Sequence, residues 1–139
     1  MFFKVTTYDP AKHIPKPNIF YIQSKGLNAG RPLREPKRNS WVIETDFVYA
    51  YEICSVLHIA KKYEHQFCGS VIPFLRIEDF KSVALPYLKN LSFPMIKELT
   101  TLQNIEILQT ITQNKLKLVQ ELKISTAYHL LQKIDSSTA

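Results

Sequence analysis

A chain of 139 residues that is 45% hydrophobic and 22% charged has the composition of a single globular domain, which excludes a disordered protein. Its length is enough to bury roughly two-thirds of the surface that the unfolded chain exposes. With only two cysteines and a net charge of +6, it is neither a disulfide-rich secreted domain nor a strongly acidic chain. The amino end lacks a secretory signal and no apolar stretch reaches the roughly 20 residues of a membrane span, so we expect a cytoplasmic protein without a membrane partner.

The positive charge is concentrated in the first 40 residues. These hold eight Lys and Arg against two acids, whereas residues 41–139 hold ten residues of each sign. A basic amino-terminal third on a balanced body favours a polyanionic partner, although basic loops are also common as solvated surface.

Three strands are predicted in the first third of the chain. Alternating apolar and polar residues predict a strand over residues 2–8. Compact runs of aromatic and β-branched residues predict two more, over 19–22 and 40–45. Between them, closely spaced Gly and Pro residues make residues 25–38 a loop.

A helix should follow the third strand. Asp46 is expected to cap it, because apolar residues then recur at steps of three and four from Phe47 to Ala60. A strand with a proline is expected over 71–75, at an edge or a bulge. A short helical turn over 78–82 and an extended segment over 83–86 would complete the globular part.

The last part of the chain is expected to be helical. After Pro94 it contains neither Gly nor Pro, so about forty residues can form one helix, or two broken near Gln113 and Asn114. Ser92 can cap this helix and Pro94 fits its first turn. A helix longer than about 25 residues cannot bury its apolar stripe on so small a domain, which predicts a partner surface. The stripe residues expected at that interface are Leu108, Ile111, Leu118, Val119 and Leu122.

These elements predict an α+β fold. Residues 1–92 would form a small mixed or antiparallel sheet domain with one packed helix. Residues 93–139 would form a long C-terminal helical segment that resembles a coiled coil and is straight or bent.

The chain has no pattern typical of an enzyme. Its histidines and cysteines lack metal-ligand spacing, and neither a phosphate-binding loop nor a nucleophile elbow is present. We therefore expect no catalytic residue, no metal and no cofactor. One enzyme hypothesis stays open, a metal-dependent nuclease that uses Asp46, Glu78 and Asp79 with Lys81.

The loop over residues 25–38 is the most suggestive functional pattern, because cations alternate in it with glycine and asparagine. Arg and Lys neutralise phosphates, Asn can pair with adenine, and glycine lets backbone amides approach a sugar-phosphate chain. The alternative is that Asn28 and Gly30 supply turn positions with positive φ while the charges keep the loop solvated. The predicted DNA-binding residues are Lys25, Asn28, Arg31, Arg34, Lys37 and Arg38.

Two phrases carry a resemblance to a known family. Residues 20–33, FYIQSKGLNAGRPL, and residues 69–80, GSVIPFLRIEDF, resemble the signature of an uncharacterised bacterial family of about this length. That resemblance implies no particular activity.

The second half also resembles the target recognition domain of type I restriction-modification specificity subunits. In that family a glycine-led strand, an acidic turn and an Ile-Pro-Leu-Pro phrase precede a glutamine-containing helix and a coiled-coil spacer. The corresponding features here are, in order, residues 69–72, residues 78–80, residues 83–86, Gln103 with Ile105, and the helix to Ile134.

This second resemblance implies a non-catalytic DNA-recognition module. Its partners would be double-stranded DNA and a methyltransferase or nuclease subunit that supplies the chemistry. Specificity subunits normally carry two recognition domains and this chain has one, so a homodimer joined through the C-terminal helices would restore the pair. A protein-protein adaptor that uses this helix, with an incidental basic loop, is the alternative.

Overall fold

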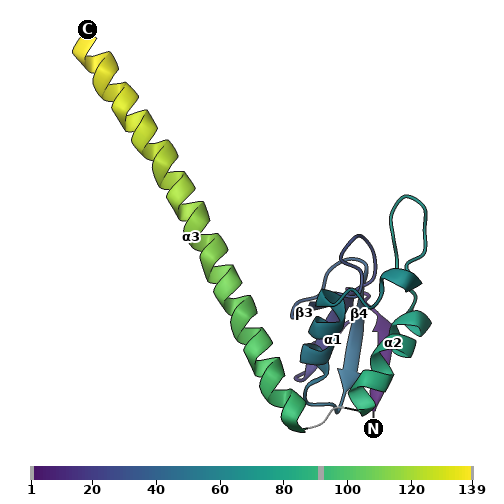
Figure 1. Ribbon diagram of the computed structural model, residues 1–139. Helices are drawn as coiled ribbons and strands as arrows, with labels where there is room; N and C mark the ends of the chain where they lie inside the picture. The colour runs from purple at the N-terminus through teal and green to yellow at the C-terminus, as the bar shows by residue number, and fades with distance from the viewer. Residues whose placement is uncertain (1, 91–92, 139) are drawn as a thin grey trace. The chain divides into compact units, whose positions relative to one another are not determined.

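The three predicted strands form one antiparallel sheet in the computed structural model, which describes residues 2–90 and 93–138 (Figure 1). A fourth, two-residue strand within the basic loop adds an edge, so that the strand order is β1-β4-β2-β3. The fold is α+β, as predicted. The strands are β1 (Phe3–Thr7), β2 (Ile19–Gln23), β3 (Pro32–Leu33) and β4 (Ser40–Thr45). The helices are α1 (Ala50–Ile59), the short 3-10 helix η1 (Glu64–Gln66), α2 (Ile77–Lys89) and α3 (Phe93–Thr138).

Strand register divides the sheet into two faces. Val5, Ile43 and Phe20 are cross-strand neighbours, and Trp41 and Ile22 form the next row. The last four belong to the main hydrophobic core with residues of α1 and α2, and the half-buried Val5 packs against it. A shift of one residue would turn these side chains to the opposite face, so their burial determines the register.

Two helices pack on this face of the sheet, where one was predicted. The helical turn expected over 78–82 is helical but is part of the longer helix α2. The extended segment expected over 83–86 is wrong, because α2 continues through it with Pro86 inside the helix. Phe80, Ala84 and Leu88 recur every four residues on α2 and are all buried. Their packing outweighs the roughly 3 kcal/mol that an interior proline costs a helix.

Two further expectations are also corrected. Asp46 does not cap α1, which begins at Ala50 without a side-chain cap. Instead the Asp46 carboxylate accepts a hydrogen bond of 2.7 Å from the backbone N–H of Phe2, and so joins the start of the chain to the end of β4. Residues 71–75 form no strand, because Phe74 makes only isolated bridges, to Cys68 and Lys25. The tip of this loop is exposed.

The other face of the sheet is covered in part by the segment between β1 and β2. His13 in this segment makes a hydrogen bond of 2.7 Å between its Nε2 and the hydroxyl of Tyr21. The Glu44 carboxylate lies 3.0 Å from the Lys16 ammonium and 3.7 Å from that of Lys4. The hydrogen bond from Lys16 lowers the pKa of Glu44. These two lysines are therefore already partnered by a carboxylate.

The long helix α3 runs without a break through Gln113 and Asn114, which settles the two alternatives in favour of one helix. Its predicted start at residue 93 is confirmed, and the proposed cap Ser92 lies outside the described residues. The chain divides into two compact units, Met1–Leu99 and Thr100–Ala139. Leu99 is buried in the core of the first unit.

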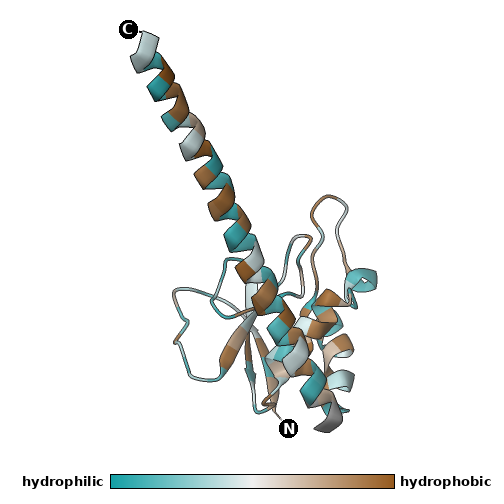
Figure 2. Cartoon of the chain, turned by 60° about the vertical axis from the view of Figure 1, so that its left-hand side comes forward, coloured by the Kyte–Doolittle hydropathy of each residue, from teal (hydrophilic) through white to brown (hydrophobic). Residues whose placement is uncertain are grey.

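The predicted stripe residues of α3 are exposed. Apolar and polar residues alternate along the helix (Figure 2). The side chains of Leu108, Ile111, Leu118, Val119 and Leu122 are 45 to 66% exposed. No helix in the described part of the chain is long and apolar enough to cross a membrane.

Candidate functional site

The basic loop is anchored to the sheet at both ends. The backbone N–H of Gly30 donates to the carbonyl of Gln23 at 2.7 Å, which closes the first half of the loop. Gly26 donates from its backbone to Pro73 at 2.8 Å and so ties the loop to the segment before α2. Gly26 and Gly30 both have φ near +90°, a conformation that glycine adopts without strain. The loop cations are therefore presented on a fixed backbone.

A tight turn presents Lys37 and Arg38 just before β4. The buried Ser40 hydroxyl donates to the carbonyl of Lys37 at 2.5 Å and lies 3.2 Å from its backbone N–H. Asn39 completes the turn at φ +62°, a left-handed conformation that asparagine tolerates. The interpretation that gave Asn28 a positive φ is wrong, whereas Gly30 does have one.

Four chain segments meet beside this turn and continue the sheet past the ends of its strands. The backbone N–H of Tyr8 donates to Ser40 at 3.0 Å, and that of Ser24 donates to Asn39 at 2.9 Å. On the far side, Leu75 donates from its backbone to Ser24 at 2.9 Å. The surface above these segments is thus built on backbone hydrogen bonds.

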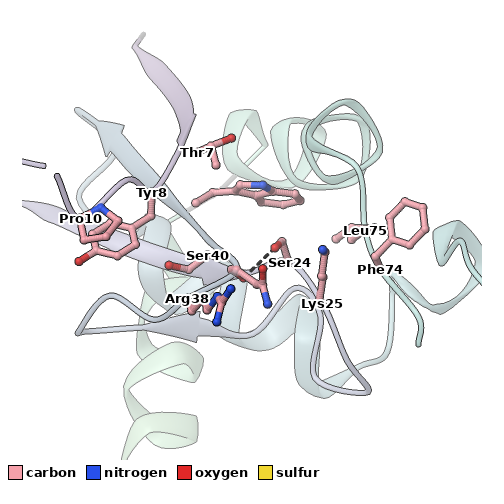
Figure 3. Close-up of a pocket in the computed structure, with 11 residues that line it drawn as sticks. Thr7, Tyr8, Pro10, Ser24, Lys25, Arg38, Ser40, Phe74 and Leu75 are labelled. Atoms are coloured by element: carbon pink, nitrogen blue, oxygen red, sulfur yellow. Dashed lines mark hydrogen bonds between the residues drawn. The ribbon is translucent and has the colours of Figure 1, made fainter. Parts of the chain in front are cut away.

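A pocket of about 590 Å³ opens over the four segments, and we call it the cation pocket. Lys25 and Arg38 line it between Tyr8 and Phe74 (Figure 3). No Asp or Glu is among its described lining residues. Its complete described lining is Thr7, Tyr8, Pro10, Ser24, Lys25, Arg38, Asn39, Ser40, Trp41, Phe74 and Leu75.

The cation pocket combines positive charge with apolar walls. Lys25 and Arg38 are exposed, so their charged groups lie in solvent, where a ligand can reach them. Trp41 is only 5% exposed, whereas Tyr8 is half-buried and Phe74 is 36% exposed. Two cations without a carboxylate attract an anion, and aromatic walls suit a planar group.

Arg31 and Arg34 of the loop lie outside the cation pocket. The Arg34 guanidinium lies 3.5 Å from the centre of the Tyr51 ring and 4.0 Å from the carboxylate of Glu52, both on α1. Arg31 lies near His58, close to the end of α1. Asn28 lines a separate pocket of about 220 Å³ with His58. The structure thus brings Lys25 and Arg38 together and places Arg31 and Arg34 beside α1.

His58 makes stability depend on pH. Burial, and secondarily the nearby charge of Arg31, lower its pKa. The folded protein then resists protonation of His58, whereas the unfolded chain takes up a proton at the ordinary pKa of about 6.5. We expect the free energy of unfolding to fall as pH decreases through this value. Urea unfolding at pH 8 and pH 5.5 should show a smaller decrease in His58→Gln than in the unchanged protein, and equal decreases would contradict this assignment.

The nuclease alternative gains no support from the geometry. No group of three or more His, Cys, Asp or Glu side chains within the described residues is placed to hold a metal ion. Asp79 accepts a hydrogen bond of 2.7 Å from the Arg76 guanidinium, and Asp46 is bound to the backbone of Phe2. Cys54 is a buried thiol and Cys68 is a half-buried one.

The aromatic wall of the cation pocket was not predicted. Tyr8, Trp41 and Phe74 were interpreted only as strand residues, although each stands next to a loop boundary. Tyr8 and Trp41 are 33 positions apart, as are Trp41 and Phe74, so no local sequence pattern connects them. The one available signal was the pair of phrases shared with the uncharacterised family, since residues 24, 25, 74 and 75 of the pocket fall inside those phrases.

Comparison with known proteins identifies a family but no activity. The model of the family of unknown function DUF6943 matches residues 5–129. No curated protein matches the chain, and neither does any solved structure. The resemblance to restriction-modification specificity subunits therefore receives no support from these comparisons. The matched range includes every lining residue of the cation pocket and most of α3, and the chain belongs to the family of unknown function DUF6943.

Proposed function

We propose that the chain is a non-catalytic DNA-recognition module that binds the phosphate backbone through its basic loop. One observation carries this proposal. Lys25, Arg31, Lys37 and Arg38 are all exposed, and within residues 2–90 and 93–138 none of them forms an ion pair with a carboxylate. A nucleic-acid strand can therefore reach them without displacing an internal partner.

Three other basic residues near the sheet contrast with these four. Lys4 and Lys16 share the carboxylate of Glu44, and Arg34 is engaged by Tyr51 and Glu52. Among the residues that the structure describes, four of the five cations of the loop over residues 25–38 are thus without a carboxylate partner. Such local concentration of charge raises the affinity for a polyanion more than the net charge of +6 alone would suggest.

The proposal predicts how DNA binding depends on salt. Binding of a duplex should weaken linearly in a plot of log affinity against log salt, with a slope of about −0.9 for each phosphate contacted. Arg31→Gln with Lys37→Gln should flatten that slope by about 1.8, because two phosphate contacts are lost. Fluorescence anisotropy of a labelled duplex over a salt series measures this slope.

The matched control removes two charges elsewhere. Lys62→Gln with Lys89→Gln changes the net charge equally, and both lysines are exposed outside the loop. This control should leave the slope within experimental error of the unchanged protein. Equal flattening by both double variants, or no binding of the duplex at low salt, would refute the proposal.

A module of this kind needs a partner for catalysis. In this proposal, cleavage or methylation of DNA is supplied by a separate methyltransferase or nuclease subunit. Co-purification with such a subunit, retained after nuclease treatment, would support this part of the proposal.

A second candidate function is self-association through α3, which the exposed stripe favours. Residues 100–139 hold four lysines against three acids, so two copies can meet with little net repulsion. We expect light scattering to give twice the 16.1 kDa chain mass. Leu118→Glu with Leu122→Glu should restore the single mass.

The control for self-association adds the same charge to the opposite side of the helix. Helical spacing places Gln113 and Gln120 there, so Gln113→Glu with Gln120→Glu should keep the doubled mass. A single chain mass for the unchanged protein would exclude a homodimer. The adaptor hypothesis would then require α3 to bind a different protein.

A further inference from the structure

We propose that the cation pocket receives one unstacked nucleotide, with its phosphate on Lys25 and Arg38 and its base against the aromatic wall. This inference rests on the proposed function, because the nucleotide is taken to belong to a nucleic-acid strand held by the basic loop. It adds that the strand is single or locally unpaired at this point.

The size of the pocket supports a small ligand. Its volume of about 590 Å³ lies within the range of roughly 300–1,000 Å³ that is usual for sites binding small molecules. A stacked base pair inside a duplex cannot enter a pocket, so a base must first leave the stack. The ligand is therefore a single nucleotide unit and not a stretch of double helix.

The chemistry of the lining supports a ligand with two unlike ends. Lys25 and Arg38 are donors suited to phosphate oxygens, and Arg can bind two of these oxygens at once. Tyr8, Pro10 and Phe74 supply apolar surface beside them. Stacking on aromatic side chains accepts every base, which predicts affinity with little sequence preference at this position.

The backbone around the pocket is already organised for binding. Ser24 and Ser40, which flank the cations, have hydroxyl groups that donate to backbone carbonyls of residues 39 and 37. The segments that carry Lys25 and Arg38 are joined by the backbone hydrogen bond from Ser24 to Asn39. Little ordering of the protein is then required when the ligand enters.

The only tryptophan of the chain, Trp41, lines the pocket and reports on it directly. Its fluorescence should change in a saturable way on titration with a short oligothymidylate strand. Lys25→Ala with Arg38→Ala should raise the Kd for this strand by about tenfold or more, because two charge-assisted contacts are removed. Arg31→Ala with Lys37→Ala removes the same charge outside the pocket, so it should weaken binding of a strand held by the loop but leave the Kd for thymidine monophosphate, a ligand of the pocket alone, unchanged.

Two further probes separate the sources of the ligand. Thymidine monophosphate tests a free nucleotide, and the duplex of oligothymidylate with oligoadenylate tests paired DNA. If thymidine monophosphate changes Trp41 fluorescence but no strand binds, the pocket assignment stands and the proposed function is wrong. If the single strand binds more tightly than the duplex and alters Trp41, both are supported.

The remaining outcomes overturn the inference. If nucleic acid binds with unchanged Trp41 fluorescence and both double variants weaken binding equally, the pocket is not used and the proposed function stands. If neither the strands nor the nucleotide bind, both proposals fail. Circular dichroism of each variant shows that a lost signal reflects binding, and all four substituted side chains are exposed.

Discussion

Phe80→Ala is expected to lower the free energy of unfolding by about 3 to 5 kcal/mol, the usual cost of truncating a fully buried phenyl ring. Phe80 on α2 is completely buried. Its ring stacks on Phe3 of β1 at 6.2 Å and lies 5.6 Å from the rings of Trp41 and Tyr63. Removing it leaves a cavity among three aromatic rings from distant parts of the chain. Urea denaturation followed by far-ultraviolet circular dichroism measures the loss.

The milder variant Phe80→Leu separates cavity formation from a general loss of α2. Leucine keeps much of the apolar volume, so a decrease of about 1 to 2 kcal/mol is expected. Because Trp41 contacts Phe80 and also lines the cation pocket, the alanine variant should shift tryptophan emission even in native conditions. A loss below about 1 kcal/mol in Phe80→Ala would contradict the packing described for this core.

Gly30→Ala should have the second-largest effect, with a loss of about 2 to 4 kcal/mol, because two penalties coincide. Gly30 has φ +92°, which costs an L-residue about 1 kcal/mol or more. A Cβ at this position would also lie 2.5 Å from Cδ2 and 2.9 Å from Cε2 of the Tyr63 ring. Tyr63 is 1% exposed, so its ring has little space into which it can move. Thermal and urea unfolding give the change.

Gly26→Ala is the matched control for this prediction. Gly26 has nearly the same φ, +93°, but a Cβ there would meet only the Gln23 side-chain amide at 3.5 Å, an ordinary contact. Its expected loss is the backbone penalty alone, about 1 kcal/mol. The difference between the two variants therefore measures the clash with Tyr63. Equal losses at both glycines would show that the Tyr63 ring yields without cost.

These stability effects bear on the proposed binding surface. Gly30 closes the basic loop through its hydrogen bond to Gln23, and Tyr63 packs beneath it. Gly30→Ala should thus disturb Arg31 and the far side of the loop more than Lys25 and Arg38, which are held by Ser24 and Asn39. Gly30→Ala should accordingly change nucleotide binding in the cation pocket less than it changes the salt dependence of duplex binding.

Local patterns alone were enough to predict the main strands, the long helix and the positions of the loop cations. Strands alternate every two residues and helices repeat every three to four, and these periods are written in neighbouring residues. β4 was predicted with its observed bounds, and β2 was predicted to within one residue. The concentration of positive charge before residue 40 also needs no structure to be seen.

Other features depended on contacts between residues far apart in the chain. Pro86 argued locally for the end of a helix, but burial of Phe80, Ala84 and Leu88 against the sheet carries α2 to Lys89. Asp46 has the chemistry of a helix cap, yet it binds the backbone of Phe2, 44 residues away. Non-local packing and pairing energies exceed these local preferences, which amount to about 1 to 3 kcal/mol each.

The sequence by itself determined which residues carry the charge, and the tertiary structure decided which of them act together. Lys25 and Arg38 are 13 positions apart and share a pocket because residues 24 and 39 are hydrogen-bonded neighbours. Arg34 lies between them in sequence and is instead drawn to Tyr51 and Glu52 on α1. The charge of a side chain follows from its residue type, whereas the residues that surround it are determined by strand pairing and helix packing across the whole domain.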